Sequence, residues 1–68
     1  MHELGIMTGV MEAATTSARE AGATRLLKVT LSIGEMTEAI EDALRFAFEA
    51  LRETDPFTAD AEIDIRMV

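Results

Sequence analysis

The stretch RLLKVTLSI, residues 25–33, sets the architecture of this chain, because apolar and polar side chains alternate along most of it. Such alternation is typical of a β-strand with one buried face and one wet face. The face that we expect to be buried carries Leu27, Val29, Leu31 and Ile33, and the other carries Leu26, Lys28, Thr30 and Ser32. Gly34 ends the strand. The sequence therefore predicts a sheet covered on one side.

The segment before this strand, residues 4–21, has the spacing of an amphipathic helix. Its apolar side chains recur at steps of three and four, at Met7, Val10, Met11, Ala14, Ala18 and Ala21. Gly22 follows the last of them and suits a left-handed residue that ends a helix. Gly5 and Gly9 each weaken the first turns by roughly 1 kcal/mol relative to alanine. We therefore expect a helix whose start frays easily.

A second helix is predicted to begin after Thr37, whose hydroxyl can accept from a backbone N–H at the helix start. Its apolar stripe comprises Ile40, Ala43, Leu44, Ala47, Phe48 and Leu51. Phe46 lies off this stripe, so we expect it to face a partner. The run Thr54-Asp55-Pro56 stops the helix.

Residues 61–67 alternate again and predict a second strand. The order helix, strand, helix, strand favours a right-handed crossover with parallel strands. The expected fold class is α/β, more narrowly a two-layer α+β fold in which two helices cover one face of a small sheet. Two strands alone make a poor sheet with open edges. A third strand or a second copy must cover those edges, so we expect a homodimer or a larger closed oligomer that uses a sheet edge in the contact.

Length and composition limit the number of domains, the possible partners and the expected location. Sixty-eight residues allow one domain, residues 1–68, and the chain has no Cys, so neither a disulfide nor a Cys-based zinc site is expected. A net charge of −7 argues against nucleic acid and anionic membranes as partners. No apolar run approaches the ~20 residues of a membrane span. Acidic Glu3 and Glu12 interrupt any signal-peptide pattern, so a cytoplasmic location is expected.

The start of the chain carries the candidate chemistry. The α-amine of Met1, the backbone nitrogen of His2 and its imidazole Nδ1 can close adjacent five- and six-membered chelate rings around one metal ion. Three nitrogen donors in a plane suit Ni(II) or Cu(II). Glu3 can add a carboxylate oxygen or a hydrogen bond. Protons compete for the same nitrogens, so binding weakens as pH falls. The predicted metal site is Met1, His2 and Glu3.

Spacing alone does not establish this site, because a His after the start Met is a chance residue in most proteins. No second His or acidic pair stands at ligand spacing nearby. Whether an acidic residue folds back to His2 is not readable from sequence, and the candidates are Glu35, Glu38, Glu41 and Asp42. Met7 and Met11 are one helical turn apart, which is more typical of core packing than of a copper site.

Four segments together resemble the HypA family of hydrogenase-maturation metallochaperones. They are MHEL at residues 1–4, KVTLSIGE at 28–35, EDALRFAFE at 41–49 and ADAEIDI at 59–65. The resemblance implies that His2 is the nickel ligand. Some relatives have an acidic residue near nickel at the start of the second helix, where this chain has Ile40. Glu41 or Asp42 are possible substitutes.

The family continues into a zinc module with two Cys-x-x-Cys pairs and then returns a strand to the sheet, and these residues include neither. The chain is either a fragment or a natural short form. By resemblance, the function expected is a nickel-binding module, not an enzyme, that delivers Ni(II) to the hydrogenase large-subunit precursor with the GTPase HypB. The rivals are an interaction module that dimerises through open sheet edges, with His2 idle, and a copper-binding N-terminus.

Overall fold

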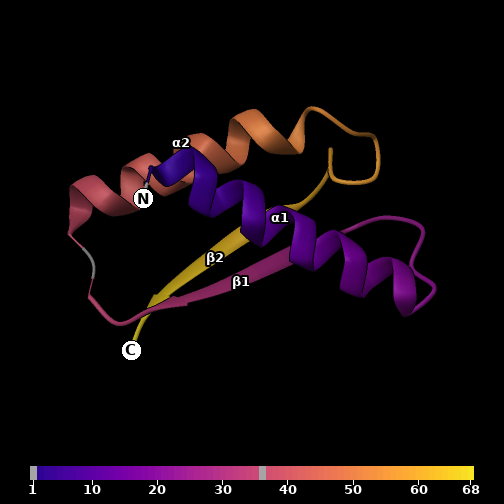
Figure 1. The fold of residues 1–68 in the computed structure, drawn as a ribbon, viewed down its shortest axis with the longest axis horizontal. Helices are drawn as coiled ribbons and strands as arrows, with labels where there is room; N and C mark the ends of the chain where they lie inside the picture. The colour runs from indigo at the N-terminus through magenta and orange to yellow at the C-terminus, as the bar shows by residue number, and fades with distance from the viewer. Residues whose placement is uncertain (1, 36) are drawn as a thin grey trace.

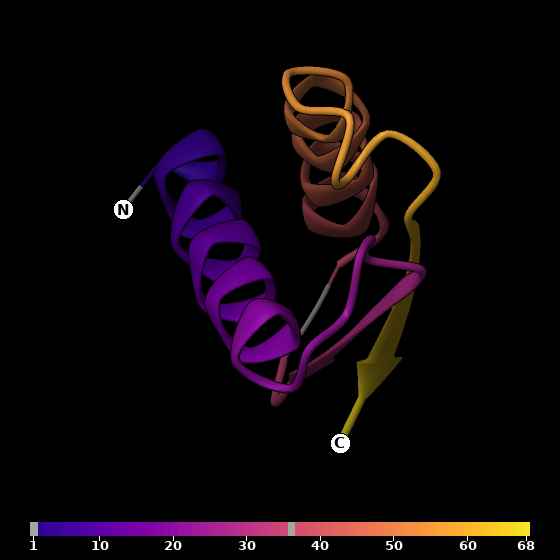
Figure 2. The same cartoon turned by 90° about the vertical axis from the view of Figure 1, so that its right-hand side faces the viewer.

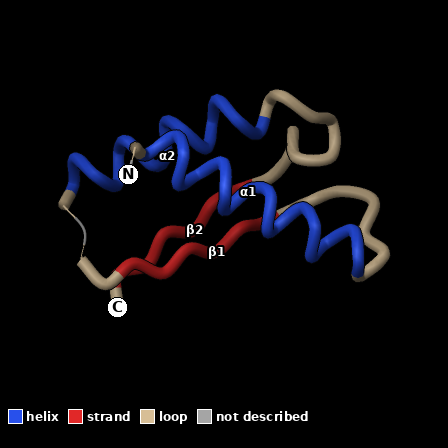
Figure 3. The backbone as a smooth tube through the Cα atoms, in the orientation of Figure 1, coloured by secondary structure: helices blue, strands red, loops and turns tan. Residues whose placement is uncertain are grey.

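The fold has two helices and two strands in alternation. The computed structural model describes residues 2–35 and 37–68. Helix α1 spans Glu3–Glu20, strand β1 Lys28–Ile33, helix α2 Glu38–Arg52 and strand β2 Glu62–Met67 (Figure 1). This order confirms the predicted one. Both helices lie on the same side of the strands, as the tube in Figure 3 and the turned view in Figure 2 show.

The helix ends follow the local chemistry. Gly22 has φ of 85°, and the Ala23 N–H donates to the carbonyl of Ala18 at 3.0 Å, which is the hydrogen bond of a Schellman motif. The Thr37 hydroxyl accepts from the Ile40 N–H at 3.2 Å and caps α2, as the sequence predicts. Helix α2 ends at Arg52, and the chain then forms a turn in which Asp55 Oδ1 accepts from the Phe57 N–H at 2.8 Å.

The two strands pair in parallel. The register sets Val29 against Ile63 and Leu31 against Ile65, and these apolar side chains belong to the core or pack against it. Ile33 stands against Met67, which is 65% exposed. β1 begins at Lys28 rather than at Arg25. Consequently the prediction that Leu27 is buried is wrong, because it lies outside the strand and is 59% exposed, whereas Leu26 is 7% exposed.

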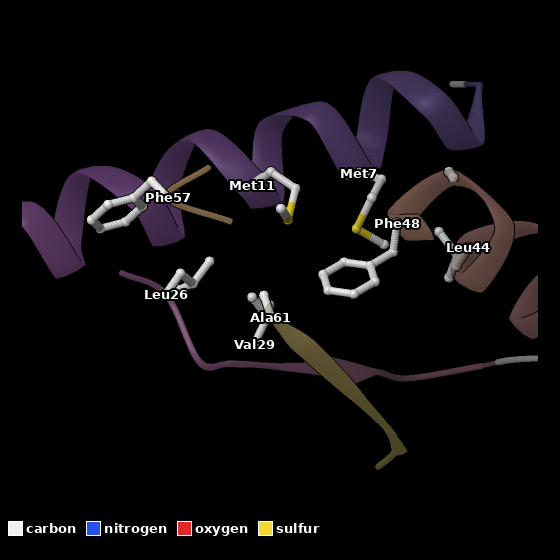
Figure 4. Close-up of a cluster of buried hydrophobic side chains, with 9 residues drawn as sticks. Met7, Met11, Leu26, Val29, Leu44, Phe48, Phe57 and Ala61 are labelled. Atoms are coloured by element: carbon white, nitrogen blue, oxygen red, sulfur yellow. The ribbon is translucent and has the colours of Figure 1, made fainter. Parts of the chain in front are cut away.

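One core joins all of these elements. Its buried members are Met7, Met11, Leu26, Val29, Leu44, Ala47, Phe48, Phe57 and Ala61. Figure 4 shows the Met7 and Phe48 side chains pointing toward each other between α1 and the sheet. Met7 and Met11 are therefore core residues, as their spacing indicates. Ile40 was predicted on the buried stripe but is 42% exposed, because it stands in the first turn of α2, one turn before Leu44 enters the core.

Candidate metal centre

The candidate site lies at the start of α1. His2 is the residue that caps this helix, with an extended backbone of φ −82° and ψ 144°. Its imidazole Nδ1 accepts a hydrogen bond from the Leu4 N–H at 3.2 Å. Nδ1 is therefore unprotonated and holds its lone pair toward the backbone. An unprotonated imidazole nitrogen is the form of His that binds a metal.

The imidazole is open to solvent. The His2 side chain is 80% exposed, and its other nitrogen, Nε2, lies 3.9 Å from the nearer carboxylate oxygen of Glu3, which is too long for a hydrogen bond. Glu3 occupies the first helical position, where the helix dipole favours a negative charge. The structure thus brings His2 and Glu3 together, while Met1, the third predicted ligand, lies outside the described residues.

No further ligand comes from α2. Within residues 2–35 and 37–68, no group of three His, Cys, Asp or Glu side chains is placed to hold a metal ion. Glu41 instead accepts a hydrogen bond from Arg45 Nε at 2.9 Å. Neither Glu41 nor Asp42 lines the space beside His2, so the suggested substitution for an acidic ligand at Ile40 finds no support. Among the described residues, α2 therefore adds no acidic side chain to the space beside His2.

What α2 places beside His2 is an apolar hollow of about 350 Å³. It is lined by His2, Glu3, Leu4, Ala43, Phe46, Ala47 and Ala50. Phe46, which lies off the apolar stripe, is 79% exposed and forms part of this wall. The hollow itself was not predicted. The signal for it is the run of small residues Ala43, Ala47 and Ala50 on the side of α2 that faces the start of α1.

Comparison with known proteins identifies the family of this chain. The family model described as "Hydrogenase/urease nickel incorporation, metallochaperone, hypA" matches residues 1–68. The chain belongs to the HypA family. A hydrogenase maturation factor HypA of Methanopyrus kandleri is 44% identical over 66 residues, which are 96% of this chain and 46% of the relative. One from Chloroflexus aurantiacus is 41% identical over all 68 residues, which are 59% of its length.

The HypA fold is also shared. The solution structure of the nickel metallochaperone HypA from Helicobacter pylori matches 100% of this chain and 58% of its own, with a TM-score of 0.83 and 27% identity. The chain thus spans about half the length of the relatives that it matches. In the part of the chain that the structure describes, no helix is both long and apolar enough to cross a membrane.

Proposed function

We propose that this chain is a nickel-binding module that holds Ni(II) at its N-terminus and delivers it for maturation of [NiFe] hydrogenase. The observation that carries the proposal is the exposed His2 imidazole, with Nδ1 unprotonated at the start of α1, in a chain of the HypA family. The acceptor is the hydrogenase large-subunit precursor, and the GTPase HypB is the second partner. The module works in the cytoplasm and is not an enzyme.

The proposed donor set rests on the chelate chemistry of the first residues. Nickel is the cargo, and the Met1 amine, the backbone nitrogen of His2 and Nδ1 are the donors on three sides of a plane. Binding displaces the proton of the His2 backbone N–H, a step that Ni(II) promotes better than Zn(II). The fourth position stays open for Glu3, water or a ligand from the acceptor. An open position at an exposed site suits transfer, because an incoming donor reaches nickel before the others leave.

The test is a nickel titration of tagless protein with a free α-amine. We expect about one Ni(II) per chain and the absorption spectrum of a planar, nitrogen-rich site. His2→Asp and N-terminal acetylation should each abolish the spectrum, since one removes the imidazole and the other the amine. Binding that survives both changes would exclude this site. Absence of nickel binding in the parent chain would favour the rival, an interaction module in which His2 only caps a helix.

A further inference from the structure

The His2 nitrogen that would bind nickel, Nδ1, already accepts a hydrogen bond that caps α1. Nδ1 accepts from the Leu4 N–H at 3.2 Å and so satisfies one of the backbone donors that a helix start leaves without a partner. A neutral imidazole has one unprotonated nitrogen, and that nitrogen has one in-plane lone pair. The lone pair cannot accept from Leu4 and bind a metal at the same time. The cap and the chelate are mutually exclusive.

The first turn of α1 depends on this cap because little else holds it. His2, Leu4, Gly5 and Ile6 are all exposed, and the first buried residue of the helix is Met7. The Thr8 hydroxyl donates to the Leu4 carbonyl at 2.7 Å, which ties the turn only to the helix itself. An alanine Cβ at Gly5 would meet nothing within 4 Å, so this glycine has no packing role and only weakens the turn.

We propose that nickel binding uncaps α1, so that the turn of residues 3–6 loosens when His2 holds nickel and re-forms when nickel leaves. This inference rests on the proposed function. The core does not change, because it begins at Met7. The wall of the apolar hollow does change, because Leu4 moves relative to Ala47 and Phe46 of α2. The surface beside the site therefore differs between the loaded and the empty chain.

By thermodynamic linkage, the stability of the capped turn also affects the affinity for nickel. If nickel disfavours the capped turn, then any contact that favours the capped turn lowers the affinity for nickel by the same factor. An acceptor that presses on Leu4 across the hollow would thus promote release. The same linkage makes the coupling measurable in the chain alone, through a substitution that stabilises the turn without touching a nickel donor.

The experiment measures backbone chemical shifts by NMR with and without Ni(II), which is diamagnetic in a planar nitrogen site. We expect the helical Cα shifts of residues 3–6 to collapse toward coil values on nickel binding, while those from Met11 to Ser17 stay unchanged. His2→Asp, which keeps a cap but removes the imidazole, should show no such change. Helical shifts that persist at residues 3–6 with His2 saturated would overturn the inference.

The matched pair Gly5→Ala and Gly9→Ala measures the coupling. Alanine at residue 5 stabilises the turn that nickel loosens, so the dissociation constant for Ni(II) should rise about two- to fivefold. Alanine at residue 9 lies beyond that turn and also meets nothing within 4 Å, so it should leave the constant unchanged. Equal constants for both variants would overturn the inference and leave the proposed function standing. No uptake by the parent chain would overturn both.

Discussion

At the scale of the residue, His2 has a structural role that is separable from metal binding. Its Nδ1 caps α1, and replacing an N-cap by alanine costs about 0.5–2 kcal/mol. In metal-free buffer we expect His2→Ala to lower the free energy of unfolding by about 1 kcal/mol, or roughly 4–8 °C in Tm for a domain of this size. His2→Asp should match the parent or exceed it, because Asp is a preferred N-cap.

Thermal denaturation in the presence of a chelator measures this difference. The comparison of the two variants removes effects of the lost imidazole that have nothing to do with the cap, since both lack it. Equal melting temperatures for His2→Ala and His2→Asp would show that the cap contributes nothing. The sequence did not indicate this role, because His is not among the residues that typically begin helices, whereas Thr37 is and its cap was predicted.

At the scale of the element, the start of β1 decides which of two adjacent leucines is buried. The Leu26 N–H donates to the Phe57 carbonyl at 2.8 Å, and this bond draws the segment before the strand toward the loop that follows α2. Leu26 is thereby turned into the core beside Phe57, and Leu27 is left in solvent. Alternation within the strand was predicted correctly from Val29 to Ile33. Its extension to Leu27 failed because the alternation holds only within β1, which begins at Lys28.

Leu26→Ala and Leu27→Ala form a matched pair that tests this correction. Removing a buried leucine side chain costs about 2–5 kcal/mol, so Leu26→Ala should destabilise the chain by an amount in this range. Leu27→Ala should change the free energy of unfolding by no more than about 0.5 kcal/mol. Urea denaturation of both variants gives the two values. A larger loss for Leu27→Ala would restore the burial that the alternation predicts.

The order of elements and the cap at Thr37 were predictable because each rests on a local pattern, and the parallel pairing was predictable because the strand–helix–strand order favours it. The apolar hollow and the exposure of Ile40 were not, since both depend on where along α2 the start of α1 packs. Likewise the sequence predicted that His2 and Glu3 belong to one metal site, but it gave no means to decide whether Glu41 lies near them. The structure shows Glu41 paired instead with Arg45, four residues on along α2, at 2.9 Å.

At the scale of the whole molecule, the edge of β1 that faces away from β2 carries backbone groups that can pair with a second copy of the chain. The carbonyls of Leu27 and Ile33 accept from Glu62 and Val68 of the β2 side, at 3.0 and 2.9 Å. In a parallel ladder, alternate residues direct their backbone groups to the same neighbour. The N–H and C=O of Lys28, Thr30 and Ser32 therefore point to the opposite edge. Among the described residues no strand pairs there.

We expect the 68-residue chain to form a dimer by antiparallel pairing of β1 with β1 of a second copy, centred on Thr30. This register sets Lys28 opposite Ser32 of the second copy, so no like charges meet. It also sets Val29 opposite Leu31 of that copy, which extends the apolar surface that the helices only half cover. The net charge of −7 opposes association, but salt screens exposed charges over roughly 8 Å at physiological strength, so the dimer should strengthen with salt.

Light scattering across a hundredfold dilution should therefore report a mass near twice 7.4 kDa that falls at the lowest concentrations.

Thr30→Pro tests the edge itself, because proline lacks the N–H that the pairing needs. That N–H faces away from β2, so its loss leaves the β1–β2 ladder intact, and circular dichroism should show the variant folded but monomeric. Thr30→Val keeps the backbone donor and should stay dimeric. A mass near 7.4 kDa for the parent at every concentration would rule the dimer out. In that case the exposed donors of β1 are satisfied by water, and the two helices bury the core of a single chain without help.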